Sequence, residues 1–325
     1  MIFNAALQAD RPNGTARLAA CVLAVVLVCL ALAGCSSSGG ETAEQSSGST
    51  DAASQQKTVV SVLCANQLAG PLSELEQLYA SENDDVQFSQ DSEGSSKALA
   101  KSLADNAEEA AAASSASSES TDAAAAAAPD GPTAYSLVIG MSDNEENSAQ
   151  KAGCLNGDTV SDLVSDYLVI AAGTEGKASS ATVKNLLAGT YPLMMAPSDS
   201  ALGSLQCQAL QQLGGRTANG SYVGALTKKG AVKTAKSTSG VFAKLSENKG
   251  KTVAIVRASD VYRYGGVKIV GEIPARAYTA PVYSSALTAY AGDEQLDAAR
   301  KFLDWCTTDA DAQRIWEKWG FKLAA

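Results

Sequence analysis

The body of the chain alternates short apolar, β-branched runs with stretches of helical periodicity, and this alternation limits its possible folds more than any other feature. The first run, 58–63, is typical of a buried strand. The next stretch opens at Gly70-Pro71 and places apolar residues three and four positions apart, which indicates a helix with one packed face. The same patterns predict strands at 86–89, 136–140, 167–172, 191–196, 252–256 and 267–270, and helices at 95–103, 182–188, 201–213, 239–247, 293–306 and 308–319. Strands that alternate with helices predict an α/β fold with mainly parallel sheets.

The N-terminus has the parts of a secretory signal. Arg11 and Arg17 precede an apolar run over 18–33, and Gly34 and Cys35 follow it, so the exit reads Leu32-Ala33-Gly34-Cys35. This ending is a lipobox, in which small residues suit the signal peptidase and the Cys35 thiol receives a lipid. An uncleaved transmembrane helix is the alternative, but the run is shorter than the ~20 apolar residues that a span needs. We therefore predict a signal peptide over 1–35 and an exported protein that is lipid-anchored to the outer face of the cell membrane.

Residues 36–57 are nearly all small or polar, so they bury too little apolar surface to offset the entropy of ordering. We expect a flexible tether that lets a globular body move above a membrane. The remainder, about 270 of the 325 residues, is long enough for a large core or two lobes.

Composition excludes several classes of function. The net charge of -10 argues against a nucleic-acid partner, which requires basic surfaces. The chain contains no His, the commonest general base and metal ligand, so Ser-His-Asp and Cys-His enzymes are excluded and a zinc enzyme is disfavoured. No constellation of paired carboxylates suggests another chemistry. We expect a binding protein without catalytic residues, metal or cofactor.

Four of the seven cysteines remain after the signal and Cys35 are set aside: Cys64, Cys154, Cys207 and Cys306. Outside the cytoplasm they permit two disulfides, in any of three pairings. Four buried free thiols are the equal alternative.

A second low-complexity stretch, 104–134, is rich in Ala and Ser and closes with Pro129-Asp130-Gly131-Pro132. Alanine favours continuation of the preceding helix, whereas the Ser run and the closing turn favour a loop. The stretch has no periodic apolar face, so we interpret it as an insertion and not as a domain.

Several short segments of the body occur in a characteristic order and spacing. The first half contains Gly94-Ser95-Ser96 before Leu99-Ala100. The second half contains 197–203, 208–214, 253–260, 266–270 and the ending Ile315-Trp316-Glu317-Lys318-Trp319-Gly320-Phe321. No single segment is highly specific, but together, across the body from Thr58 to Phe321, they resemble the molybdate-binding proteins of ABC importers.

The resemblance implies the type II periplasmic-binding-protein fold, which has two α/β lobes and a ligand cleft between them. Lobe 1 would comprise 58–168 and 283–325, including the 104–134 insertion, and lobe 2 would comprise 169–282. The chain would cross near 167–172 and return near 278–283.

Three predicted helix starts carry hydroxyl groups: Ser95-Ser96, the 198–203 loop and Thr238-Ser239. A helix N-terminus presents unpaired N–H groups and a partial positive charge, so it attracts anions without any basic residue. Each serine alone is most simply an N-cap, and only the resemblance implies that the three starts converge. A cage built of donors alone would favour a fully deprotonated tetrahedral dianion.

The resemblance implies a ligand site formed by Gln67, Ser96, Ala201, Leu202, Ser239 and Arg257. Two of these depart from the family pattern. Asn66-Gln67 stands where the family has a serine, although amides also donate hydrogen bonds. Arg257 stands where the family usually has a tyrosine. It either grips a larger or carboxylated anion in the cleft, or points away to solvent or to a carboxylate.

The predicted function is that of a solute-binding component of an ABC importer. Its partners would be a small oxyanion, a membrane ABC permease and, through the anchor, the membrane, and we expect a monomer. Molybdate or tungstate is the first candidate ligand. The alternatives are another small anion, sulfate-like or carboxylate, and a non-transporting surface sensor on the same fold.

Overall fold

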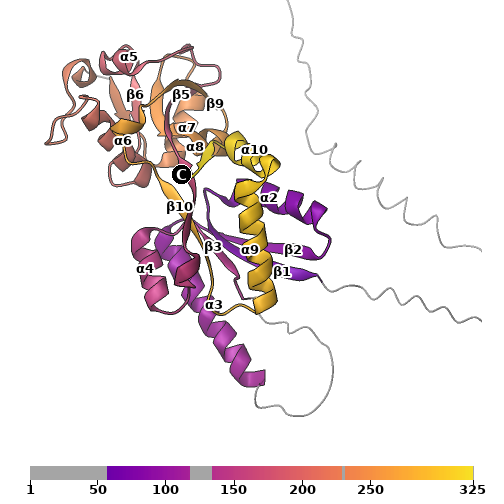
Figure 1. Cartoon of the computed structure of the whole chain (residues 1–325). Helices are drawn as coiled ribbons and strands as arrows, with labels where there is room; N and C mark the ends of the chain where they lie inside the picture. Colours follow the sequence, from indigo (N-terminus) through magenta and orange to yellow (C-terminus); the bar gives the residue numbers. More distant parts are fainter. Residues whose placement is uncertain (1–56, 118–133, 229–230, 325) are drawn as a thin grey trace, which may run out of the picture. The chain divides into compact units, whose positions relative to one another are not determined.

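The computed structural model describes residues 57–117, 134–228 and 231–324, all within one compact unit, Gln55–Ala325. The predicted signal peptide, Cys35 and all of the tether except Lys57 lie outside these residues. Two mixed sheets organise the unit, with strand orders β11-β4-β10-β3-β1-β2 and β7-β6-β8-β5-β9 (Figure 1). Helices connect most of the strands, and the α/β prediction is confirmed. The expectation of mainly parallel sheets is wrong, because both sheets also contain antiparallel pairs where the chain passes between them.

The first sheet has a parallel half and an antiparallel half. β1 pairs in parallel with β2 and with β3, whereas β10 runs antiparallel to β3 and β4, and β11 antiparallel to β4. Its strands are β1 (Thr58–Ala65), β2 (Val86–Glu93), β3 (Leu137–Ile139), β4 (Ser161–Asp166), β10 (Val282–Leu287) and β11 (Phe321–Leu323).

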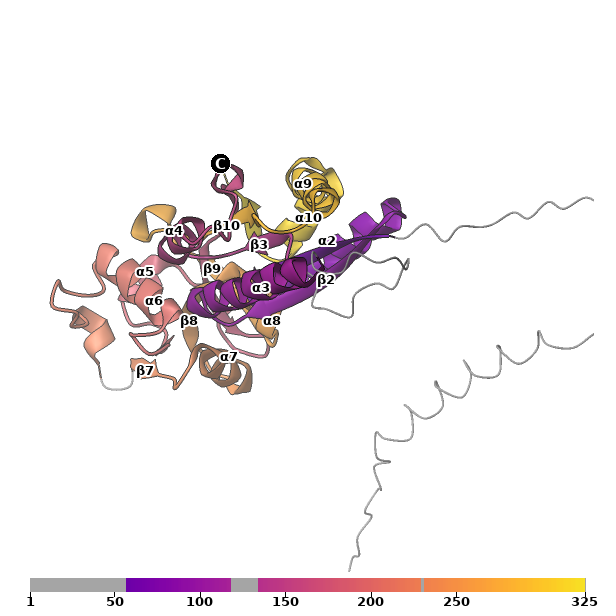
Figure 2. The same cartoon turned by 90° about the horizontal axis from the view of Figure 1, so that it is seen from below.

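Helices from both ends of the described chain cover this sheet. Tyr79 of α2 (Ala69–Glu82) meets Phe302 of α9 (Asp293–Thr308) edge to ring, with 5.3 Å between the ring centroids. α10 (Ala310–Lys318) packs on α2 and α9. α3 (Ser96–Ser117) packs against α4 (Asp143–Lys151), and Figure 2 shows α3 and α9 on different sides of β3.

The second sheet separates two clusters of apolar side chains. Leu168 and Ile170 of β5 point into one cluster, while Val169 and Ala171 point into the other, as the two-residue period of a strand requires. α6 packs its Ala209 and Leu210 into the first cluster, and α7 packs into the second. The elements are β5 (Leu168–Gly173), α5 (Val183–Leu187), β6 (Leu193–Met195), α6 (Ala201–Gln212), β7 (Val232–Thr234), α7 (Thr238–Glu247), β8 (Val253–Arg257), α8 (Ala258–Tyr264) and β9 (Val267–Glu272).

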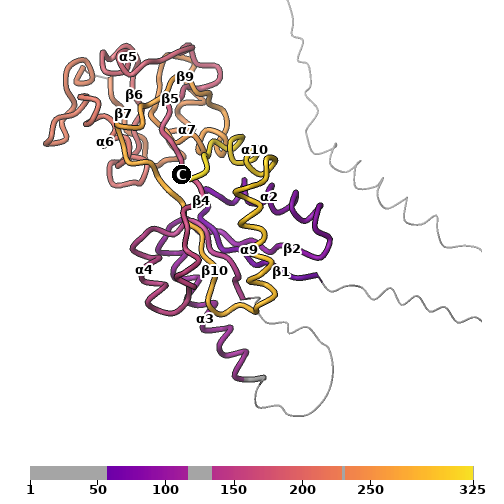
Figure 3. The backbone as a smooth tube through the Cα atoms, viewed as in Figure 1, coloured from indigo at the N-terminus to yellow at the C-terminus, as the bar shows by residue number. Residues whose placement is uncertain are grey.

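Two passages of the chain join the sheets (Figure 3). Hydrogen bonds tie these passages together. The chain leaves β4 at Asp166 and enters β5 at Leu168, then returns between β9 and β10. The Asp166 amide donates to the Pro281 carbonyl at 2.9 Å, and the Leu168 amide donates to the Tyr278 hydroxyl at 2.9 Å.

The structure also decides two alternatives that the sequence leaves open. The helix predicted over 95–103 continues as α3 to Ser117, so the described first part of the insertion is helical. The four body cysteines are free thiols, of which Cys64, Cys154 and Cys306 are buried. These three therefore pack as small apolar side chains, whereas Cys207 is partly exposed and contacts Arg216. Among the described residues, no helix is long and apolar enough to cross a membrane.

Candidate functional site

The carboxyl ends of three parallel strands meet at one edge of the second sheet. β6 pairs in parallel with β7 and β8, so Met195, Thr234 and Arg257 end neighbouring strands at this edge. α6 follows β6 and α7 follows β7, so both helices begin there. Ligands of open α/β sheets bind outside the carboxyl ends of strands, which makes this edge one half of the candidate site.

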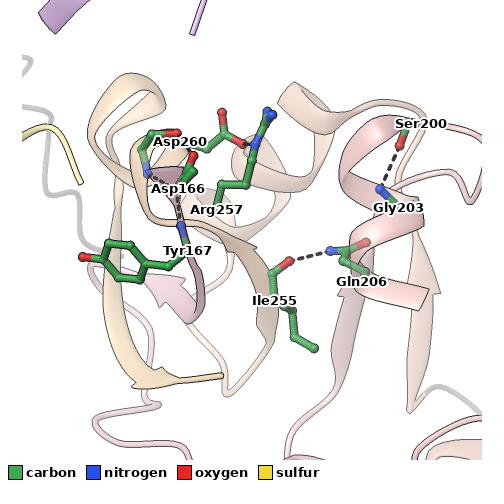
Figure 4. A network of polar contacts seen from close by, with 9 residues as sticks. Asp166, Tyr167, Ser200, Gly203, Gln206, Ile255, Arg257 and Asp260 are labelled. Carbon is green, nitrogen blue, oxygen red and sulfur yellow. Dashed lines mark hydrogen bonds and ion pairs between the residues drawn. The ribbon is translucent and has the colours of Figure 1, made fainter. Parts of the chain in front are cut away.

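The start of α6 is held in place by its own cap and by a buried amide (Figure 4). The Ser200 hydroxyl accepts the Gly203 N–H at 3.1 Å, as an N-cap should. Gln206 is fully buried, accepts the Ala196 N–H at 2.8 Å and donates to the Ile255 carbonyl at 2.7 Å. α6 is thereby tied to β6 and β8. Ala201 and Leu202, the first residues of the helix, contribute backbone N–H groups at this end.

α7 begins one residue earlier than the sequence predicts, at Thr238. Its cap is Ser237, whose hydroxyl accepts the Gly240 N–H at 3.1 Å. The Ser239 hydroxyl is exposed and lies 3.0 Å from the Ser237 hydroxyl. A cavity of about 430 Å³ lies beside this helix start and carries three basic side chains, Lys233, Lys236 and Lys244, around an apolar floor.

Arg257 is buried and paired with a carboxylate. Its residue is 7 % exposed, and its Nε donates to Asp260 Oδ2 at 2.7 Å, with Asp260 fully buried (Figure 4). Burial alone would lower the pKa of the guanidinium, but Asp260 and Tyr283 hold that pKa above its usual range. Arg257 therefore does not face solvent, and Asp260 balances its charge.

A second buried carboxylate, Asp166, lies at the passage between the sheets. It accepts the Tyr167 N–H at 2.8 Å, the Ser259 N–H at 3.4 Å and the Ser259 hydroxyl. Burial raises the pKa of Asp166 to about 6, although Ser259 and Arg257 oppose the shift. These contacts connect the end of β4 to α8 of the second sheet.

The first sheet presents a matching edge. β1 and β2 run in parallel with Ala65 opposite Glu93, and the Asn66 amide donates to the Glu93 carbonyl at 2.9 Å. Gln67 and Ser96 therefore follow neighbouring strand ends, and Gln67 is half-buried. Ser95 acts as the cap of α3, because its hydroxyl accepts the Ala98 N–H at 3.2 Å.

Ser96 is already engaged by groups that sequence reasoning missed. Its hydroxyl accepts the Ser142 N–H at 2.6 Å and donates to Glu145 Oε2 at 3.4 Å. The Ser142 hydroxyl donates to the same carboxylate oxygen. These hydrogen bonds, led by that from Ser142, lower the pKa of Glu145. The Ser142-x-x-Glu145 spacing is a helix-start signature, and it was the available sequence signal for this contact.

Tyr283 touches both edges. Arg257, at the end of β8, lies close enough to oppose the rise that burial causes in the pKa of Tyr283. A Cβ placed on Gly140, at the end of β3, would lie 3.4 Å from the Tyr283 ring and 2.7 Å from Ala65 Cβ. The structure thus groups Gln67 with Ser96, and Ala201, Leu202 and Ser239 with Arg257. No hydrogen bond between described residues joins the first group to the second.

Comparisons with known proteins find one family model that matches most of the chain. The model for the bacterial extracellular solute-binding protein matches residues 60–322. Among curated proteins, no sequence matches.

Three solved structures have a similar fold at low identity. A substrate-binding domain from Clostridium difficile, assigned to a molybdenum ABC transporter, has 18% identity and a TM-score of 0.62, covering 82% of this chain and 99% of its own. The periplasmic molybdate-binding protein of Azotobacter vinelandii has 16% identity and a TM-score of 0.52, covering 82% and 100%. The sulfate-binding protein SubI of Mycobacterium tuberculosis has 14% identity and a TM-score of 0.51, covering 82% and 87%. At these identities the likeness concerns the fold.

Proposed function

Because the chain belongs to the bacterial extracellular solute-binding protein family, we propose that it is the binding component of an ABC importer and takes up a small tetrahedral oxyanion. The family is not enzymatic and acts outside the cytoplasm, so the chain is an extracytoplasmic binding protein. Its fold is the two-lobed type II periplasmic-binding-protein fold. One observation carries the proposal: the N-termini of α6 and α7 and the Arg257 guanidinium lie together at the carboxyl ends of β6, β7 and β8.

We assign the ligand to a cleft between lobe 1, 58–168 with 283–325, and lobe 2, 169–282. The contributing groups are the Gln67 amide, the Ser96 and Ser239 hydroxyls and the backbone N–H groups of Ala201 and Leu202. A helix N-terminus stabilises an anion through oriented N–H groups and the helix dipole, without a formal charge. Arg257 lies at the end of β8, where Asp260 balances its charge, so it would act on a ligand together with that carboxylate.

Within the oxyanions, the resemblance puts molybdate or tungstate first. The fold neighbours include proteins named for molybdenum, molybdate and sulfate, so a sulfate-like anion or a small carboxylate is the alternative. A membrane ABC permease is the expected partner. A surface sensor that binds the anion without transport uses the same site, and a permease encoded beside this chain would favour the importer.

A thermal-shift panel tests the function. Purified protein without its signal peptide is heated with molybdate, tungstate, sulfate, phosphate or a small carboxylate. A ligand that binds only the folded chain stabilises it by about 2.7 kcal/mol at a hundredfold excess over Kd, so the true ligand raises the melting temperature. Ser239→Ala should reduce the shift, and Ser148→Ala, on the exposed part of α4, should not. If no oxyanion shifts the wild type, the proposal is wrong.

The anchor is a separate proposal. Cys35 is the only lipidation signal in the sequence, so Cys35→Ala should release the protein from membranes or leave it unprocessed. Membrane fractionation and mass spectrometry of the mature N-terminus measure both outcomes. An unmodified Cys35 in the mature wild type would contradict the anchor and leave the binding function untouched.

A further inference from the structure

One long stretch of the chain carries basic residues and no acidic ones. Residues 200–246 contain six of the 25 Lys and Arg residues and none of the 35 Asp and Glu residues, although the net charge of the chain is -10. The stretch includes α6, β7 and α7 of the second sheet. A region of positive potential therefore lies on a protein that is otherwise strongly negative.

Three of these basic residues surround the cavity beside α7. The cavity has a volume of about 430 Å³, and Lys233, Lys236 and Lys244 are exposed at its rim. Its floor includes Met194, which is buried, and Gly240 of α7. Met194 and Lys233 are partners in the pairing of β6 with β7, so both side chains point to the face of the sheet that α7 covers. No acidic residue lines this cavity.

The charges at the rim are not neutralised by close partners. Among the described residues, the ammonium groups of Lys233 and Lys236 have no ion pair, and that of Lys244 lies 3.1 Å from Glu247. Both side chains of that pair are more than half exposed, so water and salt weaken the attraction between them. The rim therefore keeps most of its positive field.

We infer that Lys233, Lys236 and Lys244 attract the oxyanion toward the start of α7 and set its rate of association, without contacting it in the bound state. The inference rests on the proposed oxyanion function. Gly240 lines the cavity and directly follows Ser239, so the cavity adjoins a proposed ligand group. The negative chain as a whole repels a dianion, whereas a cleft lined by positive charge raises association rates by roughly 10- to 1,000-fold.

Three other exposed lysines provide a matched control. Lys57 precedes β1, Lys151 ends α4 and Lys301 lies in α9, all on elements of the first sheet or its helices. Replacing these three by Gln changes the net charge as much as replacing the three cavity lysines by Gln. A second control replaces the cavity lysines by Arg, which keeps the positive charge at the rim.

The experiment measures affinity and release of molybdate and sulfate on the mature chain. Calorimetry gives Kd, the release of radiolabelled anion into an excess of unlabelled anion gives the dissociation rate, and their ratio gives the association rate. In low salt, Lys233→Gln/Lys236→Gln/Lys244→Gln should lower the association rate by about tenfold and leave the dissociation rate within about twofold. In 1 M sodium chloride, where the Debye length is about 3 Å, the difference should disappear.

Both controls should keep the association rate of the wild type, and circular dichroism confirms that each variant is folded. An equal loss in the Lys57, Lys151 and Lys301 variant would assign the effect to net charge and overturn the inference. A faster dissociation with an unchanged association rate in the cavity variant would show direct contact with the bound anion and also overturn it. In both cases the oxyanion function stands. If the wild type binds no oxyanion, the proposed function fails and the inference fails with it.

Discussion

The candidate site has a first edge, where the carboxyl ends of β1, β2 and β3 meet, and a second edge, where those of β6, β7 and β8 meet. The two edges differ in how their charged groups are held. At the second edge, Arg257 and Asp260 form an ion pair with side chains only 8% and 0% exposed. At the first edge, Glu145 is half-buried and held by two serine hydroxyls. A buried pair is fixed because separating its charges is costly, whereas a partly solvated carboxylate exchanges partners at little cost.

This difference assigns separate tasks to the two edges. The second edge is held rigidly, because Gln206 ties α6 to β6 and β8 by hydrogen bonds and Arg257 is fixed in its ion pair with Asp260. The first edge can respond to a ligand, because the hydrogen bonds of Ser96 and Glu145 are side-chain contacts that a ligand can replace. Stability should therefore depend mainly on the second edge.

The largest expected effect is at the ion pair. Asp260→Ala should lower the free energy of unfolding by about 3–5 kcal/mol, because it leaves the Arg257 guanidinium buried without its counter-charge. Urea unfolding measures the loss, with Glu145→Ala as the contrasting variant at within about 1 kcal/mol.

The double variant Arg257→Met/Asp260→Leu is the control for this prediction. Replacing both charges by apolar groups of similar size should recover most of the loss, since a buried pair contributes little net stability. Equal losses in Asp260→Ala and Glu145→Ala would contradict the distinction between the edges.

The second effect is a pH dependence at the passage between the sheets. The pKa of Asp166 is about 6 in the folded chain and lies above its usual 3.8, so the folded state binds more protons between these values. Stability from this group is therefore complete below about pH 4 and falls as the pH rises through 6. Asp166→Asn removes the titration, so relative to wild type it should gain on the order of 3 kcal/mol between pH 4 and pH 7.

Unfolding curves at several pH values measure this gain, and Asp162→Asn, on the exposed start of β4, is the control. Parallel pH profiles for wild type and Asp166→Asn would show that Asp166 is ionised in both states.

Sequence patterns predicted the elements whose burial is continuous. β8 is buried at every position and β1 at six of eight, so their apolar runs were sufficient signals. β4 (Ser-Asp-Leu-Val-Ser-Asp) and α4, whose only buried residue is Ala149, were missed because most of their side chains are polar. No local sequence pattern indicates these two elements, because each is stabilised by neighbours that are distant in sequence, such as β10 and β11 beside β4.

The same reasoning applies to the site. The helix starts of α6 and α7 were predictable to within a residue, because Ser caps are local signals. The partner of Ser96 was not, because the hydrogen bond to Ser142 spans 46 positions and exists only after β2 and β3 have both paired with β1. The counter-charge of Arg257 lies three residues away, but its burial depends on the passages between the sheets.

The smallest of these effects compares a glycine at each edge. A Cβ on Gly203, in the first turn of α6, would lie 1.8 Å from the Pro197 carbonyl oxygen, whereas a Cβ on Gly94, before α3, has no atom within 4 Å. Gly203→Ala must therefore displace the start of α6 from the 197–200 loop, at a cost of about 2 kcal/mol. Gly94→Ala should change the free energy of unfolding by no more than about 0.5 kcal/mol.

Because the displaced helix carries the Ala201 and Leu202 N–H groups, Gly203→Ala should also weaken the binding of every oxyanion alike. The ratio of the phosphate and sulfate dissociation constants should then stay unchanged. Unfolding and calorimetry on both variants measure the two effects, and a changed ratio in Gly203→Ala would show that the second edge selects the ligand.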